Sequence, residues 1–353
     1  MSAPQTMKAL TVQEGKKVKL EDVPVPTLDS NEVLIRVHSV AQNPTDWKHT
    51  DFVSPVGNII GCDFSGTVVK LGSDSINRVK VGDTVATFVH GGNYKDRGAF
   101  AQYAKADSDL VWKFSPSALS FEEAATMNCA LWTSIQAFYY HMKLDEPFSA
   151  SPKNEWILIY GGSTSLALFS TQLVKLSGYK VVTTTSPKNF NLLKSLGADV
   201  VINYKDTDLV QQIQRATGNS LKFAFDTISE ANTQTACVKS LASQGTTPGK
   251  VVVALLPNKD AQALRKDVVI QPTLIYTALG RSFEWPGIKF PASPEDKAFM
   301  ASWIPKLEKL VAKGQIKPNP VKLWPGGLSA VNEGFQYMRE GNVSAEKIVY
   351  NVD

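Results

Sequence analysis

A glycine-containing loop near the middle of the chain has the residue types that bind phosphate. It reads Ile-Tyr-Gly-Gly-Ser-Thr-Ser-Leu-Ala over residues 159–167. Glycines at a strand end permit a tight turn, and the N-terminus of a following helix offers N–H groups and a positive dipole end to a pyrophosphate. Ala167 stands where a strict GxGxxG motif has its last glycine, so a glycine turn before an ordinary helix is the alternative.

The turn after the next expected strand bears on the choice of dinucleotide. A fold that prefers NAD places Asp or Glu here for the ribose 2′-hydroxyl, yet residues 156–198 contain no acidic residue. The turn instead offers Ser186, Pro187, Lys188 and Asn189, of which the hydroxyl, ammonium and amide suit a 2′-phosphate. This pattern favours NADPH, with a solvated basic loop as the alternative. Tyr204 would contact the adenosine end or serve only in packing.

These loops require strands and helices in alternation. Short apolar runs predict six strands, at residues 156–160, 180–185, 200–204, 223–228, 251–256 and 274–279. Helical patterns ending at glycine lie between the first four, at residues 166–176, 190–196 and 209–217. A series of βα units of this kind predicts an α/β fold with a doubly wound parallel sheet of the Rossmann type.

The flanking segments have a different pattern. Over residues 1–125, short apolar runs separated by Pro, Gly, Asp and Asn predict a mostly antiparallel sheet. After residue 284 we expect a proline-containing loop, a helix at 294–312 and a strand at 347–352, too little for a separate core. Residues 285–353 should therefore fold back onto the first domain, leaving 126–284 as the nucleotide-binding domain. The cleft between the domains is the expected site.

The composition is that of an ordinary globular protein. The chain has 353 residues, 43% hydrophobic and 20% charged, and its 37 basic and 33 acidic residues give a net charge of +4. No block of Lys or Arg suggests nucleic acid or a membrane surface as a partner. The uncharged stretch 156–174 contains two central glycines, so it predicts strand, turn and helix rather than a membrane span. Three scattered cysteines and no targeting segment lead us to expect a cytoplasmic protein.

Several short motifs, in a fixed order over nearly the whole chain, carry a family resemblance. They are Asn-Pro-Thr-Asp at 43–46, Gly-Cys-Asp-Phe-Ser-Gly at 61–66, Val-Gly-Asp at 81–83, Gly-Ala-Phe-Ala-Gln-Tyr at 98–103, and the loops at 160–164 and 185–187. Together they resemble the medium-chain dehydrogenase/reductase superfamily. Within it, the chain is similar to the zinc-independent quinone oxidoreductase and enoyl reductase branch, and above all to fungal trans-acting enoyl reductases.

The resemblance implies a discontinuous GroES-like catalytic domain around a Rossmann domain, with NADPH in the cleft. At the nicotinamide and substrate end it implies Thr45, Asp46, Trp47 and Lys48. For the pyrophosphate it implies Ser163, Thr164, Ser165 and Leu166, with Ser186, Pro187, Lys188, Asn189 and Tyr204 at the adenosine end. Leu255, Leu256, Ser344 and Ala345 would close over the cofactor. The positions implied to face substrate are Thr133, Ala137, Tyr140, Tyr276 and Gly280, for which core packing is the alternative.

The same resemblance locates the place of a catalytic zinc in related alcohol dehydrogenases. Their Cys, His and Cys ligands correspond to Asn43, Cys62 and Cys129. An amide is a poor zinc ligand, the histidine is missing, and Asp63 does not restore the usual set. Three cysteines also cannot form the four-cysteine structural zinc lobe. We therefore expect no metal, and thiols that are buried or line the cleft.

Without a metal to polarise a carbonyl, hydride must reach a carbon that is already electrophilic. An α,β-unsaturated carbonyl or a quinone meets this requirement. Lys48 and Thr133 are the candidate catalytic residues, as proton donor or enolate stabiliser and as carbonyl hydrogen-bond donor, although Lys48 could equally be a surface ion-pair residue. Another enoyl reductase branch has a tyrosine acid shortly after the 43–46 turn, but this chain has His49-Thr50-Asp51-Phe52 there, so solvent could supply the proton.

The leading hypothesis is an NADPH-dependent reductase of enoyl, enal, enone or quinone substrates. An NADPH-dependent aldehyde reductase and a non-enzymatic NADPH-binding interaction protein are the alternatives. Aromatic and apolar residues near 130–140 suggest a small hydrophobic substrate, or an acyl chain bound to a carrier protein. The protein would be a monomer or a homodimer. We expect His38, His90 and His141 to be structural.

Overall fold

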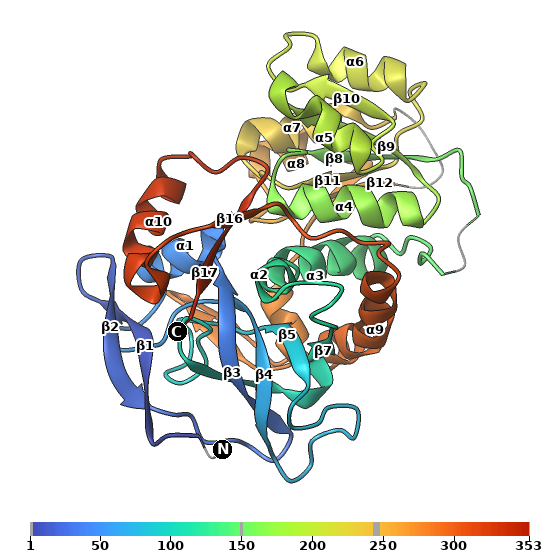
Figure 1. The fold of residues 1–353 in the computed structure, drawn as a ribbon. Coiled ribbons are helices and arrows are strands. Elements are labelled where there is room, and N and C mark those ends of the chain that lie inside the picture. The colour runs from blue at the N-terminus through green and yellow to red at the C-terminus, as the bar shows by residue number, and fades with distance from the viewer. Residues whose placement is uncertain (1–2, 149–150, 243–247, 353) are drawn as a thin grey trace. The chain divides into compact units, whose positions relative to one another are not determined.

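The computed structural model describes residues 3–148, 151–242 and 248–352, and these divide into two compact units. Unit 1 comprises residues 1–129 and 276–353, and unit 2 comprises residues 130–275. Each unit has its own sheet (Figure 1). The α/β fold class expected from the sequence, with a parallel sheet and a separate, mostly antiparallel one, is confirmed.

Unit 1 is built on a seven-stranded sheet in the order β16-β17-β3-β4-β5-β7, with β6 also paired to β3. Two hairpins, β1-β2 and β14-β15, accompany it. Alternating apolar residues of β3 such as Val33, Ile35 and Val37 pack with Phe64 and Phe100 in its core. The strands are β1 (Thr6–Gln13), β2 (Lys17–Pro24), β3 (Glu32–Ala41), β4 (Asp63–Leu71), β5 (Thr84–Phe88), β6 (Tyr103–Asp107), β7 (Trp112–Lys113), β14 (Phe283–Trp285), β15 (Ile288–Phe290), β16 (Val321–Leu323) and β17 (Lys347–Asn351).

The last strand returns the end of the chain to its beginning. β17 pairs antiparallel with β3, with Val349 opposite Ala41 and Asn351 opposite Ser39. This pairing fixes Lys347, at the start of β17, close to residues that follow β3. The described part of unit 1 contains the α-helices α1 (Pro44–Phe52), α2 (Phe121–Ala125), α9 (Pro294–Ala312) and α10 (Val331–Arg339).

Unit 2 has a six-stranded parallel sheet in the order β10-β9-β8-β11-β12-β13. Its strands are β8 (Trp156–Tyr160), β9 (Lys180–Thr185), β10 (Val200–Asn203), β11 (Phe223–Asp226), β12 (Gly249–Val253) and β13 (Val268–Pro272). Its helices are α3 (Cys129–Ile135, from residue 130), α4 (Ser165–Leu176), α5 (Phe190–Ser195), α6 (Leu209–Ala216), α7 (Ala231–Ser240) and α8 (Lys259–Leu264). The strand order reverses direction at β8, next to the glycine-containing loop.

The sixth strand lies earlier than the sequence predicted. Residues Val268–Pro272 form it, whereas Ile275–Leu279, expected as strand, form a 3₁₀ helix. Because β13 is the edge of the sheet, Pro272 removes no N–H that an inner strand would need, so the proline is tolerated. The apolar side chains of Ile275, Tyr276 and Ala278 are buried instead in a turn. Among the described helices, none combines the length and apolar character that a membrane span requires.

Candidate functional site

The glycine-containing loop of unit 2 is held tightly against β9. Gly161 has φ +82°, a conformation that glycine adopts without strain, and its N–H donates to Thr184 Oγ1 at 3.0 Å. Gly162 N–H donates to the Thr184 carbonyl at 2.7 Å, and a Cβ on Gly162 would lie 2.4 Å from Thr183 Oγ1. Glycine is therefore required at 162 by close packing.

Helix α4 begins directly after this loop. Thr164 is its N-cap, with Oγ1 accepting from Ala167 N–H at 3.1 Å. Ser163, Thr164, Ser165 and Leu166 are all partly exposed, so the loop and the first turn of the helix stay accessible. A strand end, a glycine turn and a capped helix N-terminus are the arrangement that binds a pyrophosphate.

The turn after β9 carries no acidic side chain. Lys188 is exposed in the 3₁₀ turn Pro187–Asn189, Ser186 is partly exposed and Asn189 is buried. Asp199, the next acid along the chain, accepts from Val181 N–H at 2.7 Å and pairs with Lys175 at 2.9 Å, so it lies near the opposite end of β9. Tyr204 is 45% exposed after β10, with Lys205 Nζ 5.8 Å from its ring centroid.

Four further residues were expected to close over a cofactor. Leu255 and Leu256 of unit 2 are 48% and 69% exposed, which is unusual for leucine. Ser344 and Ala345 belong to unit 1, and Ala345 has φ +58°, a conformation that costs an alanine about 1–2 kcal/mol.

In unit 1 the Asn-Pro-Thr-Asp turn becomes the start of α1. Asn43 N–H donates to Asp46 Oδ2 at 2.6 Å, and Pro44 occupies the first helical position, where no N–H is needed. This cap buries Asp46 and leaves Thr45, Trp47 and Lys48 partly exposed. Lys48 Nζ lies 5.7 Å from the Trp47 ring centroid and, among the described residues, makes no ion pair.

The five positions expected to face substrate differ in accessibility. Thr133 on α3 is 7% exposed, and Tyr140, in the π-helical turn Gln136–His141, is partly exposed beside the Lys143 ammonium. Ala137 is completely buried. In unit 1, Tyr276 is 5% exposed, and Gly280 has φ +70° against the Lys297 side chain.

A buried polar group, here called the Asp63 cluster, consists of Asn43, Asp63 and Lys347. Asp63 Oδ2 accepts from Asn43 Nδ2 at 2.8 Å and from Lys347 Nζ at 3.2 Å, and Lys347 Nζ also donates to Asn43 Oδ1. Asp63 Oδ1 accepts from Cys129 N–H at 2.8 Å. Lys347 is 2% exposed and Asp63 is fully buried, so this is a desolvated ion pair. Burial raises the pKa of the Asp63 carboxyl, against the opposing effect of Lys347.

The Asp63 cluster includes Asn43, which the family resemblance equates with a zinc ligand of related dehydrogenases. The Asn43 amide is committed to Lys347 and Asp63 through its oxygen and nitrogen. Burial raises the pKa of the Cys62 thiol well above its usual value. Among the described residues, no three His, Cys, Asp or Glu side chains are grouped to hold a metal ion. The donor set does not fit zinc.

Asp46 lies beside this cluster as a second buried carboxyl. Its Oδ1 is buried without a hydrogen-bond partner among the described residues. Burial, with a smaller effect of Asp63, raises the pKa of Asp46 to about 7.

An aromatic cluster surrounds Tyr276 on several sides. The His90 ring stacks on it with centroids 3.7 Å apart, and His49 and Trp285 lie at 5.4 Å and 6.0 Å. The Tyr276 hydroxyl is hydrogen-bonded to Thr45 Oγ1. Burial lowers the pKa of His49 to about 4 and that of His90 well below its usual value, so both imidazoles are neutral at neutral pH.

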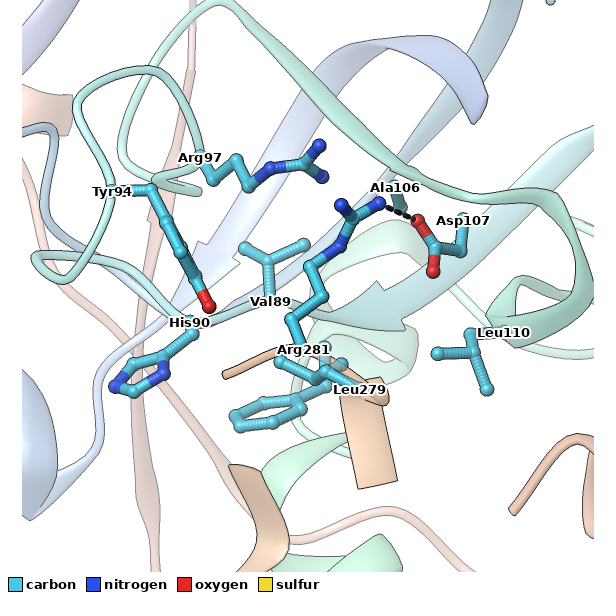
Figure 2. A pocket seen from close by; sticks show the side chains of 10 residues that line it. Val89, His90, Tyr94, Arg97, Ala106, Asp107, Leu110, Leu279 and Arg281 are labelled. Atoms are coloured by element: carbon cyan, nitrogen blue, oxygen red, sulfur yellow. Dashed lines mark hydrogen bonds and ion pairs between the residues drawn. The ribbon is translucent and has the colours of Figure 1, made fainter. Parts of the chain in front are cut away.

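A small charged pocket lies next to His90 (Figure 2). Its space of about 20 Å³ is room for one water molecule and not for a substrate. Arg281 donates to Asp107 Oδ1 at 2.6 Å and to Glu32 Oε1 at 3.1 Å. These ion pairs anchor the segment that follows Tyr276 to strands β3 and β6.

Sequence reasoning missed several members of these groups. Lys347 and Asp63 are 284 residues apart, and Tyr276 and Thr45 are 231 apart, so no local pattern indicated either pair. His49 and His90 had no partner in sequence that suggested their place beside Tyr276.

Comparisons with known proteins agree with this architecture. Residues 29–116 match the alcohol dehydrogenase GroES-like domain, and residues 166–288 match the zinc-binding dehydrogenase family. The chain is 38% identical to the trans-enoyl reductase ACTTS2 of Alternaria alternata, covering 99% of both chains. It is 39% identical to the trans-enoyl reductase TOXD of Cochliobolus carbonum, covering 81% of this chain and 95% of the relative.

Solved structures show the same fold. The quinone oxidoreductase from Coxiella burnetii is 25% identical with a TM-score of 0.74, over 99% of this chain and 100% of the other. The CurK enoyl reductase is 19% identical with a TM-score of 0.77 over the same shares.

Proposed function

The chain belongs to the medium-chain dehydrogenase/reductase superfamily and is an oxidoreductase, and we propose that it uses NADPH to reduce an activated carbon–carbon double bond or a quinone. The observation that carries this proposal is the relationship to proteins named enoyl or trans-enoyl reductases, at 34–39% identity over 81–99% of this chain. Membership in this superfamily implies a nicotinamide cofactor, which supplies hydride when it is bound.

The unit 2 loop is suited to hold the cofactor's phosphates. In the proposal, Ser163, Thr164, Ser165 and Leu166 bind the pyrophosphate through the start of α4. Ser186, Lys188 and Asn189, with Pro187 shaping the turn, bind the 2′-phosphate, and Tyr204, Leu255 and Leu256 contact the adenosine side. The choice of NADPH over NADH rests on an exposed ammonium at Lys188 and on Asp199 being engaged near the other end of β9.

The cofactor choice can be tested with a charge reversal in this turn. Lys188→Glu should raise the KM for NADPH at least about tenfold more than that for NADH, because a carboxylate would repel the 2′-phosphate. Lys194→Glu makes the same charge change on the adjacent helix α5, also at an exposed position, and should leave the ratio of the two KM values unchanged. Equal effects of Lys188→Glu on both cofactors would remove this lysine from the phosphate site.

Unit 1 contributes the groups proposed for the reacting end. Thr45, Asp46 and Trp47 would line the nicotinamide, with Ser344 and Ala345 covering the cofactor. The Lys48 ammonium, unpaired with any acid among the described residues, would stabilise the negative charge that develops on an enolate oxygen.

For the substrate itself, the Thr133 hydroxyl would donate to the carbonyl. Tyr140, Tyr276 and Gly280 would face the acyl group, whereas Ala137 would support them from the core. Since the donor set at Asn43, Cys62 and Cys129 does not fit zinc, we propose a zinc-independent reaction. It therefore needs a carbon already made electrophilic by conjugation, on a small hydrophobic molecule or an acyl chain on a carrier protein.

The proposed setting is the cytoplasm. All three cysteines lie in the described part of the chain and none forms a disulfide, which supports a reducing compartment.

A substrate panel tests the reaction. NADPH oxidation is followed with 2-enoyl thioesters, 2-alkenals, enones, quinones and saturated aldehydes, and the products are identified. The proposal predicts saturated carbonyl products or hydroquinones. An allylic alcohol with its double bond intact would show aldehyde reduction instead. Binding of NADPH without turnover of any substrate would indicate a non-enzymatic binding protein.

A further inference from the structure

Reduction of a conjugated double bond needs a proton as well as a hydride. Hydride addition at the β-carbon leaves an enolate, whose α-carbon must then be protonated. The two histidines closest to Tyr276 are poor sources, because burial keeps both imidazoles neutral. The thiol of Cys62 and the carboxyl of Asp46 are each fully buried.

The hydrogen-bonded hydroxyls of Thr45 and Tyr276 are another candidate in unit 1, beside Lys48, whose ammonium is proposed to stabilise the enolate oxygen. Thr45 is partly exposed in the first turn of α1, whereas Tyr276 lies behind it at 5% exposure. One member of the pair is therefore accessible and the other enclosed. Because the two hydroxyls are hydrogen-bonded, a proton can pass from Tyr276 to Thr45 in one step and from Thr45 to a substrate in another.

The Tyr276 ring is fixed in place by its surroundings. His90 stacks on one face with an interplanar angle of 18°, and Phe88, Phe283 and Trp285 lie around it at 5.5–6.0 Å. The ion pair of Arg281 with Asp107 (Figure 2) and its ion pair with Glu32 anchor the segment that follows Tyr276. A phenol held in this way keeps its hydrogen bond to Thr45 with little loss of side-chain entropy during the reaction.

The aromatic cluster also contains polar atoms without partners. His90 Nε2 and Trp285 Nε1 are buried, and neither has a hydrogen-bond partner among the described residues.

We propose that Thr45 donates the proton to the substrate's α-carbon and that Tyr276 replaces it. The assignment rests on the proposed double-bond reduction. The enolate's electron pair forms the new C–H bond as the Thr45 O–H bond breaks, and Tyr276 O–H transfers its proton to the Thr45 oxygen. The Tyr276 phenolate then regains a proton from solvent through the partly exposed Thr45 hydroxyl. Burial raises the pKa of Tyr276 well above its usual value, so the phenol stays protonated until the more basic enolate carbon forms.

The hydrogen bond between Tyr276 and Thr45 brings a tyrosine hydroxyl to the turn at 43–46 from a distant part of the chain. No tyrosine follows that turn, where His49, Thr50, Asp51 and Phe52 stand. The tyrosine comes from the return segment, and the hydrogen bond to Thr45 brings its hydroxyl to the same turn.

The stereochemistry of α-protonation tests this assignment. The probe is a 2-methyl-2-butenoyl thioester, reduced with NADPH, and the 2-methylbutanoyl product is resolved by chiral chromatography. The unaltered protein should give one enantiomer. Tyr276→Phe and Thr45→Val should give a mixture, because solvent then protonates either face, and should lower kcat about 100-fold with a change in the thioester KM below about threefold.

Two further variants separate chemistry from folding. Thr45→Ser keeps the hydroxyl and should keep a single enantiomer. Tyr94→Phe removes a phenol from the same cluster, one that donates to the Ser282 carbonyl at 2.6 Å, and should also keep it. If thermal unfolding shows that Tyr276→Phe does not fold, Thr45→Val still tests the proton path, because it leaves the aromatic side chains in place.

Two results would overturn the assignment. A single enantiomer from Thr45→Val and Tyr276→Phe would show that the proton comes from elsewhere, while leaving double-bond reduction in place. No saturated product from the unaltered protein would overturn the proposed function, and this assignment with it.

Discussion

Replacing Lys347 by methionine should destabilise unit 1 strongly. The ammonium is 2% exposed and is a partner of the fully buried Asp63 carboxylate. Among the described residues, removing it leaves that carboxylate with the Asn43 and Cys129 N–H donors. Breaking a buried ion pair by removing one partner costs about 3–5 kcal/mol. The loss of folding free energy has an upper limit, because the folded variant can instead protonate Asp63. At pH 7 this protonation costs about 1.4 kcal/mol for each pH unit above an ordinary pKa of about 3.9, which is about 4 kcal/mol in total.

The assay is denaturant unfolding between pH 5 and 8, with amide hydrogen exchange in β3 and β17. Because Asp63 protonates in the folded variant and stays ionised in the unfolded chain, the loss should shrink as the pH falls, by about 1.4 kcal/mol per unit. The double variant Lys347→Met with Asp63→Asn should recover most of the stability. Lys322 on β16 forms a more exposed ion pair with Glu346. Lys322→Met should therefore lower the free energy of unfolding by less than about 1 kcal/mol. A small, pH-independent effect of Lys347→Met, or no recovery in the double variant, would refute the reasoning.

Two other predictions concern Asp46 and Gly162. Since burial raises the folded-state pKa of Asp46 to about 7, the folded protein binds an extra proton between about pH 4 and 7, and stability falls as the pH rises. Asp46→Asn should remove about 1 kcal/mol per pH unit of this slope in chemical unfolding, and an unchanged slope would argue against it. Gly162→Ala places a Cβ 2.4 Å from Thr183 Oγ1. It should lower the free energy of unfolding by about 1–3 kcal/mol and weaken NADPH binding, as measured by calorimetry. Gly218→Ala, with open space around it, should cost only its backbone strain and leave NADPH binding unchanged.

The sequence predicted the elements whose signals are local. The apolar runs of β8 and β9, and the glycines that end α4 and α5, gave their positions to within a residue or two. Helix α7 has no clear apolar period, since its buried Thr233, Gln234 and Cys237 include polar residues, and it was missed. Strand β13 was missed because Gln271 and Pro272 end it, while the more apolar residues 274–279 were buried as a turn.

In the candidate site, too, residues close together in the sequence were predictable and residues far apart in it were not. The phosphate loop is contiguous in sequence, so its residues could be named before the fold was known. The Asp63 cluster and the pair of Thr45 and Tyr276 are assembled by β17 pairing with β3 and by the anchored segment near Arg281. Their members have ordinary sequence neighbours, and only the fold brings them together. The position of Asn43 predicted that a zinc ligand is missing, but no local pattern indicated its contact with Lys347.

The most direct test of the central claim is the destination of the hydride. The protein is given a 2-enoyl thioester with NADPH deuterated at the transferred position of nicotinamide C4, and the product is analysed by NMR and mass spectrometry. Reduction of the double bond predicts a saturated thioester with one deuterium at the β-carbon. Deuterium on the carbonyl carbon of an allylic alcohol, or no transfer to any unsaturated carbonyl or quinone, would contradict it.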